Sequence, residues 1–283
     1  MPFIPLDIAL PGKRRLSLAR PAVMAIVNCT PDSFWEGSRA LGKAALEAAL
    51  RAEAAGADII DFGSESTRPG AHTVPVDEEI ERLVPAIEAF RARSSLPVSV
   101  DTRKAPVAEA AIAAGADIVN DVSALSYDPA IGPLCARTGA ALVLMHMKGD
   151  PENMQKEPFY ESVVDEVRRQ LEIALHRALD CGVPADALIM DPGFGFGKRL
   201  EDNLDLLSQL AQSVPSGYPV LVGMSRKSMI GALCRREAPD RLAGTVAAHT
   251  LALCQGAQIL RVHDVAEAVD SIAVWMAVEG RKK

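Results

Sequence analysis

The segment AGADIIDFG at residues 55–63, echoed by AGADIVND at residues 114–121, contains the repeating unit of this sequence. In both segments a glycine can end a helix, and an apolar run too short for a typical helix follows at once. Such runs recur along the chain and are rich in Val, Ile, Leu and Met. They are Val23–Cys29, Asp58–Gly63, Pro97–Thr102, Ile118–Ser123, Ala141–Met147, Ala187–Pro192, Pro219–Ser225 and Ile259–Asp264.

Amphipathic stretches between these runs predict helices, among them Lys43–Ala55, Asp77–Arg93, Lys104–Ala114, Ser162–Asp180 and Arg241–Cys254. Eight strands, each followed by a crossover, predict an α/β fold with a parallel sheet closed into a (β/α)8 TIM barrel. An open doubly wound sheet is the alternative. It more often has a glycine-rich turn after its first strand, and here that turn reads NCTP. We therefore predict a single barrel domain at residues 23–283 and an N-terminal extension at residues 1–22 that caps its bottom.

The composition narrows the class of protein. The chain has 283 residues, 49% of them hydrophobic and 4% aromatic, which suits one core of strands buried on both faces. A net charge of −7 disfavours a nucleic-acid partner but permits a small anionic substrate in a local cationic pocket. The five cysteines lack CxxC spacing and predict thiols in a reducing compartment. Since no apolar run has membrane-spanning length and no signal peptide is evident, we expect a cytoplasmic protein with no membrane partner.

Polar side chains stand near the carboxyl end of every predicted strand. In a parallel barrel, these ends and the loops after them form the active-site face. Because an unpaired polar side chain inside a barrel is costly, their convergence predicts a polar pocket rather than packing. In strand order these residues are Asn28, Asp61, Asp101, Asn120 with Asp121, His146, Asp191, Ser225 to Lys227, and Arg261 to Asp264.

The side chains expected at the centre of this pocket favour a flat heterocycle with a guanidine-like edge. The carboxylates of Asp101 and Asp191 can accept hydrogen bonds from N–H donors, and Asn120 can both donate and accept. Lys227 offers donors to a ring carbonyl or nitrogen. The alternative is internal pairing of either carboxylate with Lys227 or Arg261, since ion-pair networks also occupy clefts.

A second cluster, from strands seven and eight, favours anion binding. Lys227, Ser228, Arg261 and His263 lie where barrels often bind phosphate. The Arg-x-His spacing places both side chains on the same face of a strand. A salt bridge from Arg261 to Asp264 at the barrel rim is the alternative.

Three further features are less specific. Asn28, across the mouth, can ligate Mg²⁺ through its carbonyl oxygen, because this ion takes few protein ligands. The turn GFGFGK at residues 193–198 resembles a phosphate loop, but no Ser or Thr follows its Lys, which favours an ordinary βα turn. His146 either lines the pocket wall or packs without contacting it.

Two segments combine aromatic or Arg side chains with Pro and Gly, a composition typical of lids that close over substrate. They are residues 30–37, after the first strand, and residues 64–70, after the second. Ordinary surface turns are the alternative.

Seven motifs at the ends of predicted strands resemble those of the dihydropteroate synthase family, over residues 23–279. They are NCTPDSF (28–34), ESTRPG (65–70), SVDT (99–102), VNDVS (119–123), MDPGFGF (190–196), SRKS (225–228) and RVHD (261–264). The sequence departs from the family at Phe62-Gly63-Ser64, where a second glycine is common, and at Trp35-Glu36, which replace smaller residues.

The resemblance implies a role for each site residue. The residues that would hold the pterin ring are Asp101, Asn120, Asp191 and Lys227, with Arg261 stacked on it. The residues that would hold pyrophosphate and Mg²⁺ are Asn28, as the metal ligand, Arg261 and His263. The site for p-aminobenzoate, which sulfonamide drugs mimic, would be shaped by Phe34, Thr67, Arg68, Pro69 and Ser228. Family members are generally homodimers through their last helices.

The implied reaction is dissociative substitution at the exocyclic methylene carbon of a pterin pyrophosphate, followed by attack of the arylamine. Mg²⁺, Arg261 and His263 would stabilise the departing pyrophosphate electrostatically. Asp32 would close nearby if residues 30–37 fold over the site. The predicted catalytic residues are therefore Asp32, Lys227, Arg261 and His263.

Three alternative functions stay open. A pterin-dependent methyltransferase shares the barrel and the pterin-gripping set, but has no reason to keep SRKS with Arg261 and His263 as an anion site. An aldolase-like barrel would use Lys227 as a Schiff-base amine. A non-catalytic pterin-binding paralogue would bind the pyrophosphate without releasing it.

Overall fold

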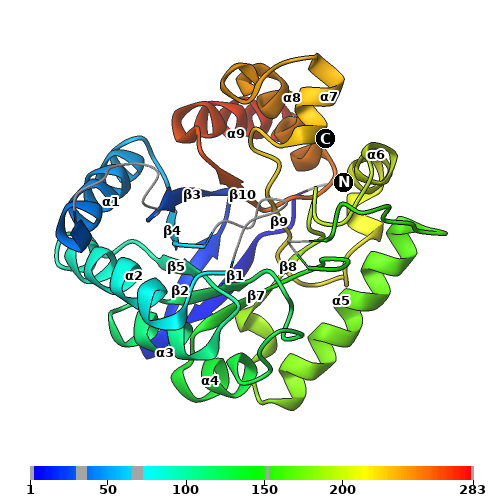
Figure 1. The fold of residues 1–283 in the computed structure, drawn as a ribbon. Helices are drawn as coiled ribbons and strands as arrows, with labels where there is room; N and C mark the ends of the chain where they lie inside the picture. The colour runs from blue at the N-terminus through cyan, green and yellow to red at the C-terminus, as the bar shows by residue number, and fades with distance from the viewer. Residues whose placement is uncertain (1–2, 30–36, 66–72, 151–152, 282–283) are drawn as a thin grey trace.

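The computed structural model describes residues 3–29, 37–65, 73–150 and 153–281, and it contains the predicted barrel (Figure 1). Parallel strands form an 8-stranded sheet in the order β8-β7-β6-β5-β4-β3-β10-β9. A parallel bridge between Met190 and Val220 brings the two ends of this sheet together. The strands are β3 (Ala22–Asn28), β4 (Ile59–Gly63), β5 (Val98–Asp101), β6 (Ile118–Asp121), β7 (Ala141–Met145), β8 (Leu188–Asp191), β9 (Leu221–Val222) and β10 (Ile259–Val262).

The helices surround the strands as an outer layer (Figure 1). They are α1 (Gly37–Ala54), α2 (Val76–Arg91), α3 (Ala105–Ala113), α4 (Ile131–Thr138), α5 (Val163–Asp180), α6 (Leu200–Ser208), α7 (Ser228–Cys234), α8 (Leu242–Cys254) and α9 (Val265–Glu279). Short 3-10 helices occupy Pro11–Lys13, Ala185–Ala187, Leu210–Gln212 and Ala238–Asp240. In the part of the chain that is described, no helix is both long enough and apolar enough to cross a lipid bilayer.

Each predicted run contains an observed strand, which confirms the (β/α)8 fold class over the open sheet. The run Pro219–Ser225 gives only the short strand β9. Pro219 has no N–H to donate to a ladder. The next carbonyl, of Val220, accepts from both Gln258 and Ile259 just before and at the start of β10. The predicted helices are also present, although α1 begins at Gly37 rather than Lys43.

The strands are buried on both faces, as the apolar runs predicted. Every residue of β4 and β7 is buried, because helices cover the outside and side chains fill the inside. Phe62 of β4 packs edge-on against Phe90 of α2, with ring centroids 6.0 Å apart. Full burial of a side chain of this size contributes about 1.5–3 kcal/mol, so such contacts fix each helix on its strand.

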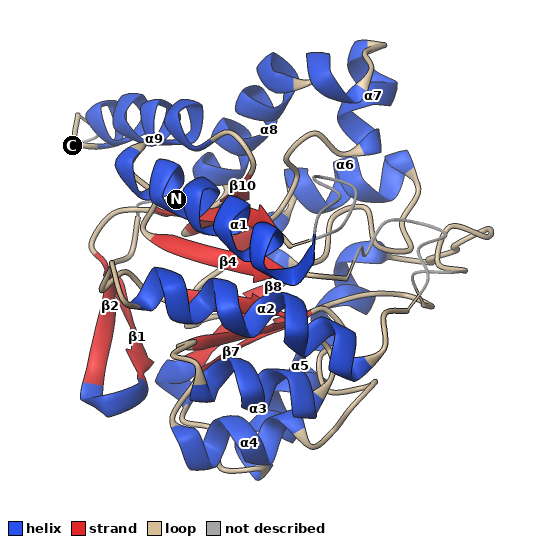
Figure 2. Ribbon diagram, turned by 60° about the vertical axis from the view of Figure 1, so that its left-hand side comes forward, coloured by secondary structure: helices blue, strands red, loops and turns tan. Residues whose placement is uncertain are grey.

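The N-terminal residues form a hairpin that the sequence did not predict, made of β1 (Leu6–Leu10) and β2 (Arg14–Leu18). Arg14 pairs with Asp117, which directly precedes β6. Gln258, just before β10, donates to the Ile4 carbonyl oxygen over 2.9 Å. The hairpin therefore lies where the barrel strands begin, away from their polar ends (Figure 2). The division of the chain after residue 22 stays a prediction.

Candidate active site

Four side chains from four strands meet at the carboxyl-terminal mouth of the barrel. Arg261 of β10 donates from Nε to Asp61 Oδ2 on β4 over 2.7 Å, and from Nη2 to Asp101 Oδ2 on β5 over 2.6 Å. Asn120 of β6 donates to the same Asp61 oxygen over 3.5 Å. The register of the sheet makes this possible, since Asp101 lies beside Gly63 on one neighbouring strand and beside Asn120 on the other. The barrel thus brings together residues predicted to share one pocket.

Asp191 and Lys227 form the other half of this site. Asp191, at the end of β8, accepts a hydrogen bond from the Gly193 N–H over 2.7 Å. Lys227, directly before α7, donates to the Phe194 carbonyl oxygen and lies 4.3 Å from the centre of the Phe196 ring. Burial lowers the pKa of Lys227 to about 8, against the opposing effect of Asp191. The charge of each residue therefore opposes the effect of burial on the pKa of the other.

The acidic side chains of the site have altered pKa values. Burial raises the pKa of Asp101 to about 7, although the adjacent Arg261 opposes the shift. Burial also raises the pKa of Asp191, with Lys227 as the main opposing charge. Burial disfavours the charged form of Arg261, but Asp61 and Asp101 outweigh this effect and hold its pKa above the usual range. Asp101 is thus close to its titration midpoint at neutral pH, which is typical of functional sites.

Two acceptor atoms at the centre of the site have no hydrogen-bond partner among the described residues. They are Asp61 Oδ1 and Asn120 Oδ1, and both are buried. A buried acceptor without a donor costs about 1–3 kcal/mol, and native proteins rarely leave one. These two oxygens are therefore free to accept hydrogen bonds from a water molecule or from the N–H groups of a ligand.

His263, which was predicted to bind an anion, and the neighbouring residues Arg226 and Asp264 form two separate contacts. Ring atom Nδ1 of His263 lies 3.0 Å from Ser225 Oγ. Arg226 donates to the two carboxylate oxygens of Asp264 over 2.8 and 2.7 Å. The alternative salt bridge from Arg261 to Asp264 is therefore wrong, because each partner is paired elsewhere. The internal pairing of Arg261 with Asp101, also considered from the sequence, is present.

Asn28 and Ser228 lie where the sequence placed them. Asn28 ends β3 with its side chain exposed, beside Gly63 in the sheet register. Ser228 is exposed at the first position of α7. No group of three or more His, Cys, Asp or Glu side chains within the described ranges could hold a metal ion. Any Mg²⁺ at Asn28 would therefore depend on water and substrate oxygens, a donor set that this ion accepts.

Five predicted site residues fall in segments outside the described residues. Asp32 and Phe34 belong to residues 30–36, and Thr67, Arg68 and Pro69 belong to residues 66–72. The departure Trp35-Glu36 lies in the first of these segments. The roles of these residues stay predictions.

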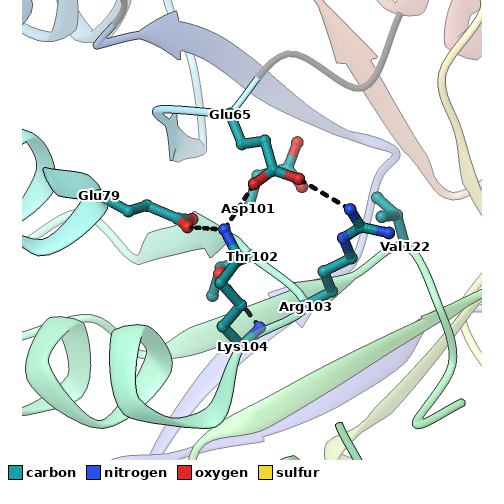
Figure 3. A pocket seen from close by; sticks show the side chains of 7 residues that line it. All are labelled: Glu65, Glu79, Asp101, Thr102, Arg103, Lys104 and Val122. Carbon is teal, nitrogen blue, oxygen red and sulfur yellow. Dashed lines mark hydrogen bonds and ion pairs between the residues drawn. The ribbon is translucent and has the colours of Figure 1, made fainter. Parts of the chain in front are cut away.

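A buried charge cluster at the carboxyl end of β5 was not predicted (Figure 3). Lys104 pairs with Glu65 over 2.5 Å and with Glu79 over 2.7 Å, and Arg103 pairs with Glu65 over 3.2 Å. Glu65 also accepts from the Val74 N–H over 3.0 Å, so it links the two flanks of residues 66–72. The charges in SVDTRK, directly after an apolar run, were a signal that could have found the cluster.

Asp61 and His146 also differ from the sequence interpretation. Asp61 was noted at a strand end but given no role, whereas it is fully buried and holds Arg261. His146 is buried, and its Nδ1 lies 2.9 Å from Nζ of Lys198. It therefore packs behind the turn at residues 193–197 rather than pairing with the charged residues at the centre of the site.

Comparison with known proteins agrees with this geometry. Residues 24–263 match the family described as pterin binding enzymes. This chain belongs to that family. Within the family, the dihydropteroate synthase of Escherichia coli (strain K12) is 44% identical over 270 residues, which cover 95% of this chain and 95% of that one.

Solved structures of pterin-binding enzymes share the barrel. The dihydropteroate synthase of Xanthomonas albilineans with 4-aminobenzoic acid has a TM-score of 0.89 and 47% identity, covering 96% of this chain and 98% of that one. A structure of the enzyme from the same organism with 7,8-dihydropteroate has a TM-score of 0.85 and 43% identity, with coverage of 96% and 98%. The family resemblance inferred from the seven motifs is therefore confirmed.

Proposed function

We propose that this protein is a dihydropteroate synthase. It condenses 6-hydroxymethyl-7,8-dihydropterin pyrophosphate with p-aminobenzoate to give 7,8-dihydropteroate and pyrophosphate, a step of folate biosynthesis. The observation that carries the proposal is the pair of buried acceptor oxygens on Asp61 and Asn120, which lack donors beside Arg261. The amino-pyrimidinone edge of a pterin supplies such donors.

The pterin ring would be held by Asp101, Asn120, Asp191 and Lys227. The carboxylates and the amide oxygen accept from ring N–H groups, and the Lys227 ammonium donates to a ring carbonyl or nitrogen. Arg261 is already fixed by Asp61 and Asp101, so its planar guanidinium is held in place to stack on the ring.

The pyrophosphate group would be bound by Arg261, His263 and Asn28. Because Arg261 keeps its charge in this environment, it can stabilise the negative charge that develops on the leaving group. The exposed amide of Asn28 fits a Mg²⁺ ion that is held mainly by substrate oxygens. When bound, this ion would neutralise pyrophosphate charge.

The p-aminobenzoate site would combine exposed Ser228 with Phe34, Thr67, Arg68 and Pro69. Sulfonamides resemble this substrate and would compete for the same site. The reaction would be dissociative, with Asp32 close to the positive charge that develops on the pterin. Attack by the arylamine then needs no strong general base.

We also propose that the protein is a cytoplasmic homodimer. Large apolar side chains are exposed on the last helices, and they are Leu233, Leu251, Val274 and Val278. An apolar surface of this kind favours association of two copies through α7, α8 and α9. All five cysteines are free, which suits a reducing compartment.

Release of pyrophosphate from the pterin substrate tests the function directly. We expect release that requires both p-aminobenzoate and Mg²⁺. Binding of the pterin pyrophosphate without release would instead support a non-catalytic pterin-binding protein or a methyltransferase.

Variants sharpen this test. Asp191→Ala and Lys227→Ala should abolish pterin binding in calorimetry, because each removes a direct ring contact. Asp186→Ala is the matched control, since that aspartate is half-exposed at the opposite end of the barrel. Normal turnover by Asp191→Ala or Lys227→Ala would contradict the assignment.

A further inference from the structure

Lys198 is a buried lysine whose contacts include no carboxylate. Its ammonium lies 2.9 Å from His146 Nδ1 and donates to the carbonyl oxygens of Gly193 over 2.8 Å and Phe196 over 3.1 Å. The residue is 3% exposed. A lysine is rarely buried without a charged partner, and here burial lowers the pKa of Lys198 to about 7 while all its polar contacts are with uncharged groups. We therefore look for the role of Lys198 in the groups that accept its hydrogen bonds.

The acceptors belong to a turn pressed against the segment that follows β7. Gly193 and Gly197 have φ angles of +70° and +62°. A Cβ atom would lie 1.9 Å from the His146 carbonyl oxygen at Gly193, and 2.2 Å from the Lys148 carbonyl oxygen at Gly197. Lys198 spans this contact, because its side chain reaches both His146 and the carbonyl oxygens of the turn. Lys198 therefore connects the turn to His146.

Other groups of the same turn contact the active-site residues Asp191 and Lys227. Its Gly193 N–H donates to Asp191, its Phe194 carbonyl accepts from Lys227, and its Phe196 ring lies under the Lys227 ammonium. The turn is thus hydrogen-bonded by two lysines, Lys198 and the active-site residue Lys227. A shift of its backbone would move contacts of both Asp191 and Lys227.

We propose that Lys198, held by His146, is a positioning residue for the pterin-binding pair Asp191 and Lys227. It fixes the position of the 193–197 backbone, and this backbone in turn fixes the position of the Lys227 amino group. Lys198 itself does not contact the substrate. The inference rests on the proposed function for its binding readout, but its effect on Lys227 can be measured without any ligand.

The test compares Lys198→Met with the control Lys43→Met, an exposed lysine of α1. Methionine keeps most of the side-chain length but donates no hydrogen bond. We expect Lys198→Met to weaken binding of the pterin pyrophosphate by about tenfold or more, because a small displacement of the turn misplaces both Asp191 and Lys227. The KM for p-aminobenzoate at saturating pterin should stay within about threefold, and the control within about twofold.

A second readout follows Lys227 in the unliganded protein. Its pH-dependent reactivity with cyanate, measured by peptide mass spectrometry, should have a midpoint near the pKa of about 8. In Lys198→Met this midpoint should move upward, because Lys227 loses part of its enclosure by the turn and also a nearby positive charge. His146→Leu keeps that charge, so a shift in this variant reports the loss of enclosure alone. A role limited to overall stability would lower Tm without moving the midpoint. Parental binding and an unchanged midpoint in folded Lys198→Met would overturn the proposal.

Variants of His146 decide the question if Lys198→Met does not fold. His146→Asn retains an acceptor near the position of Nδ1, whereas His146→Leu removes it. We expect parental binding and Lys227 reactivity in the first variant and the Lys198→Met changes, in smaller measure, in the second. Equal behaviour of the two would refute the inference. If the parent protein bound no pterin pyrophosphate, the proposed function would fail, while the Lys227 midpoint would still test the positioning role.

Discussion

Replacing Arg261 by Met removes the positive charge that directly contacts the two buried carboxylates of Asp61 and Asp101. Arg261 holds Asp61, which is fully buried, and Asp101, which is 7% exposed. Methionine preserves an unbranched apolar stem but provides no donors. Both carboxylates then stay buried without their partner.

The size of the effect follows from this geometry. Removing one partner of a buried ion pair costs about 3–5 kcal/mol, because the remaining charge is left uncompensated. For a domain of this size such a loss lowers Tm by about 5–8 °C. Loss of Arg261 removes the main charge that opposes the raised pKa of Asp101, so this pKa should rise further above about 7. A raised folded-state pKa gives stability that is present at low pH and lost as pH rises. The deficit of Arg261→Met relative to the parent should therefore grow as the pH rises from about 6 to about 9, where Asp101 ionises in the parent before it does in the variant.

Thermal unfolding followed by circular dichroism across this pH range measures the deficit without ligand. The matched control is Arg20→Met, which removes a guanidinium paired with Asp58 at the surface. That surface pair should contribute no more than about 1 kcal/mol. Adding Asp61→Asn to Arg261→Met should restore part of the lost stability by removing one stranded charge. A Tm for Arg261→Met equal to that of the control at every pH would show that the pairing is not structural.

Three further predictions concern other parts of the site. Pterin affinity should be highest between about pH 7 and pH 8, because Asp101 ionises with a pKa of about 7 and Lys227 loses its proton with a pKa of about 8. Titration calorimetry across this range measures the affinity, and a flat profile would contradict the prediction. Gly193→Ala should lower Tm far more than Gly217→Ala, since both glycines have positive φ but only the first would meet a carbonyl oxygen, at 1.9 Å; equal Tm values would count against this packing. Lys104→Met should destabilise the protein by about 3–5 kcal/mol in urea unfolding, because it leaves buried Glu79 without its ion-pair partner and Glu65 with Arg103 alone. A loss within about 0.5 kcal/mol would rule this out.

The barrel could be predicted from sequence because its signal is local and repeated. Each short apolar run, bounded by a turn and an amphipathic stretch, marks a strand without reference to any other part of the chain. The hairpin at residues 6–18 gave no such signal. Its strands carry charged and polar residues among the apolar ones, and it is stabilised by contacts with the distant Asp117 and Gln258. Tertiary contacts of that kind leave no local periodicity.

That polar side chains from several strands meet at one rim was also predictable, because a parallel barrel gathers all strand ends there. The pairing within it was not. Arg261 is separated from Asp61 by 200 positions and from Asp101 by 160, and sequence alone offered Asp264 as an equally plausible partner. The choice depends on side-chain direction. Arg261 points into the barrel, where β4 and β5 present their carboxylates, while Asp264 lies beyond the strand and meets Arg226.

Lys198 was overlooked for a similar reason, because its role depends on which groups it contacts in the folded chain. As part of GFGFGK it was judged as a phosphate-loop lysine, for which the sequence lacks the following Ser or Thr. The structural role of Lys198 leaves no sequence motif. Its partners are a histidine directly after β7 and backbone carbonyl groups, which every residue possesses. Backbone carbonyls become specific ligands only after the chain has folded. Residues that shape a site through the backbone are therefore the part of a functional centre that sequence patterns are least able to identify.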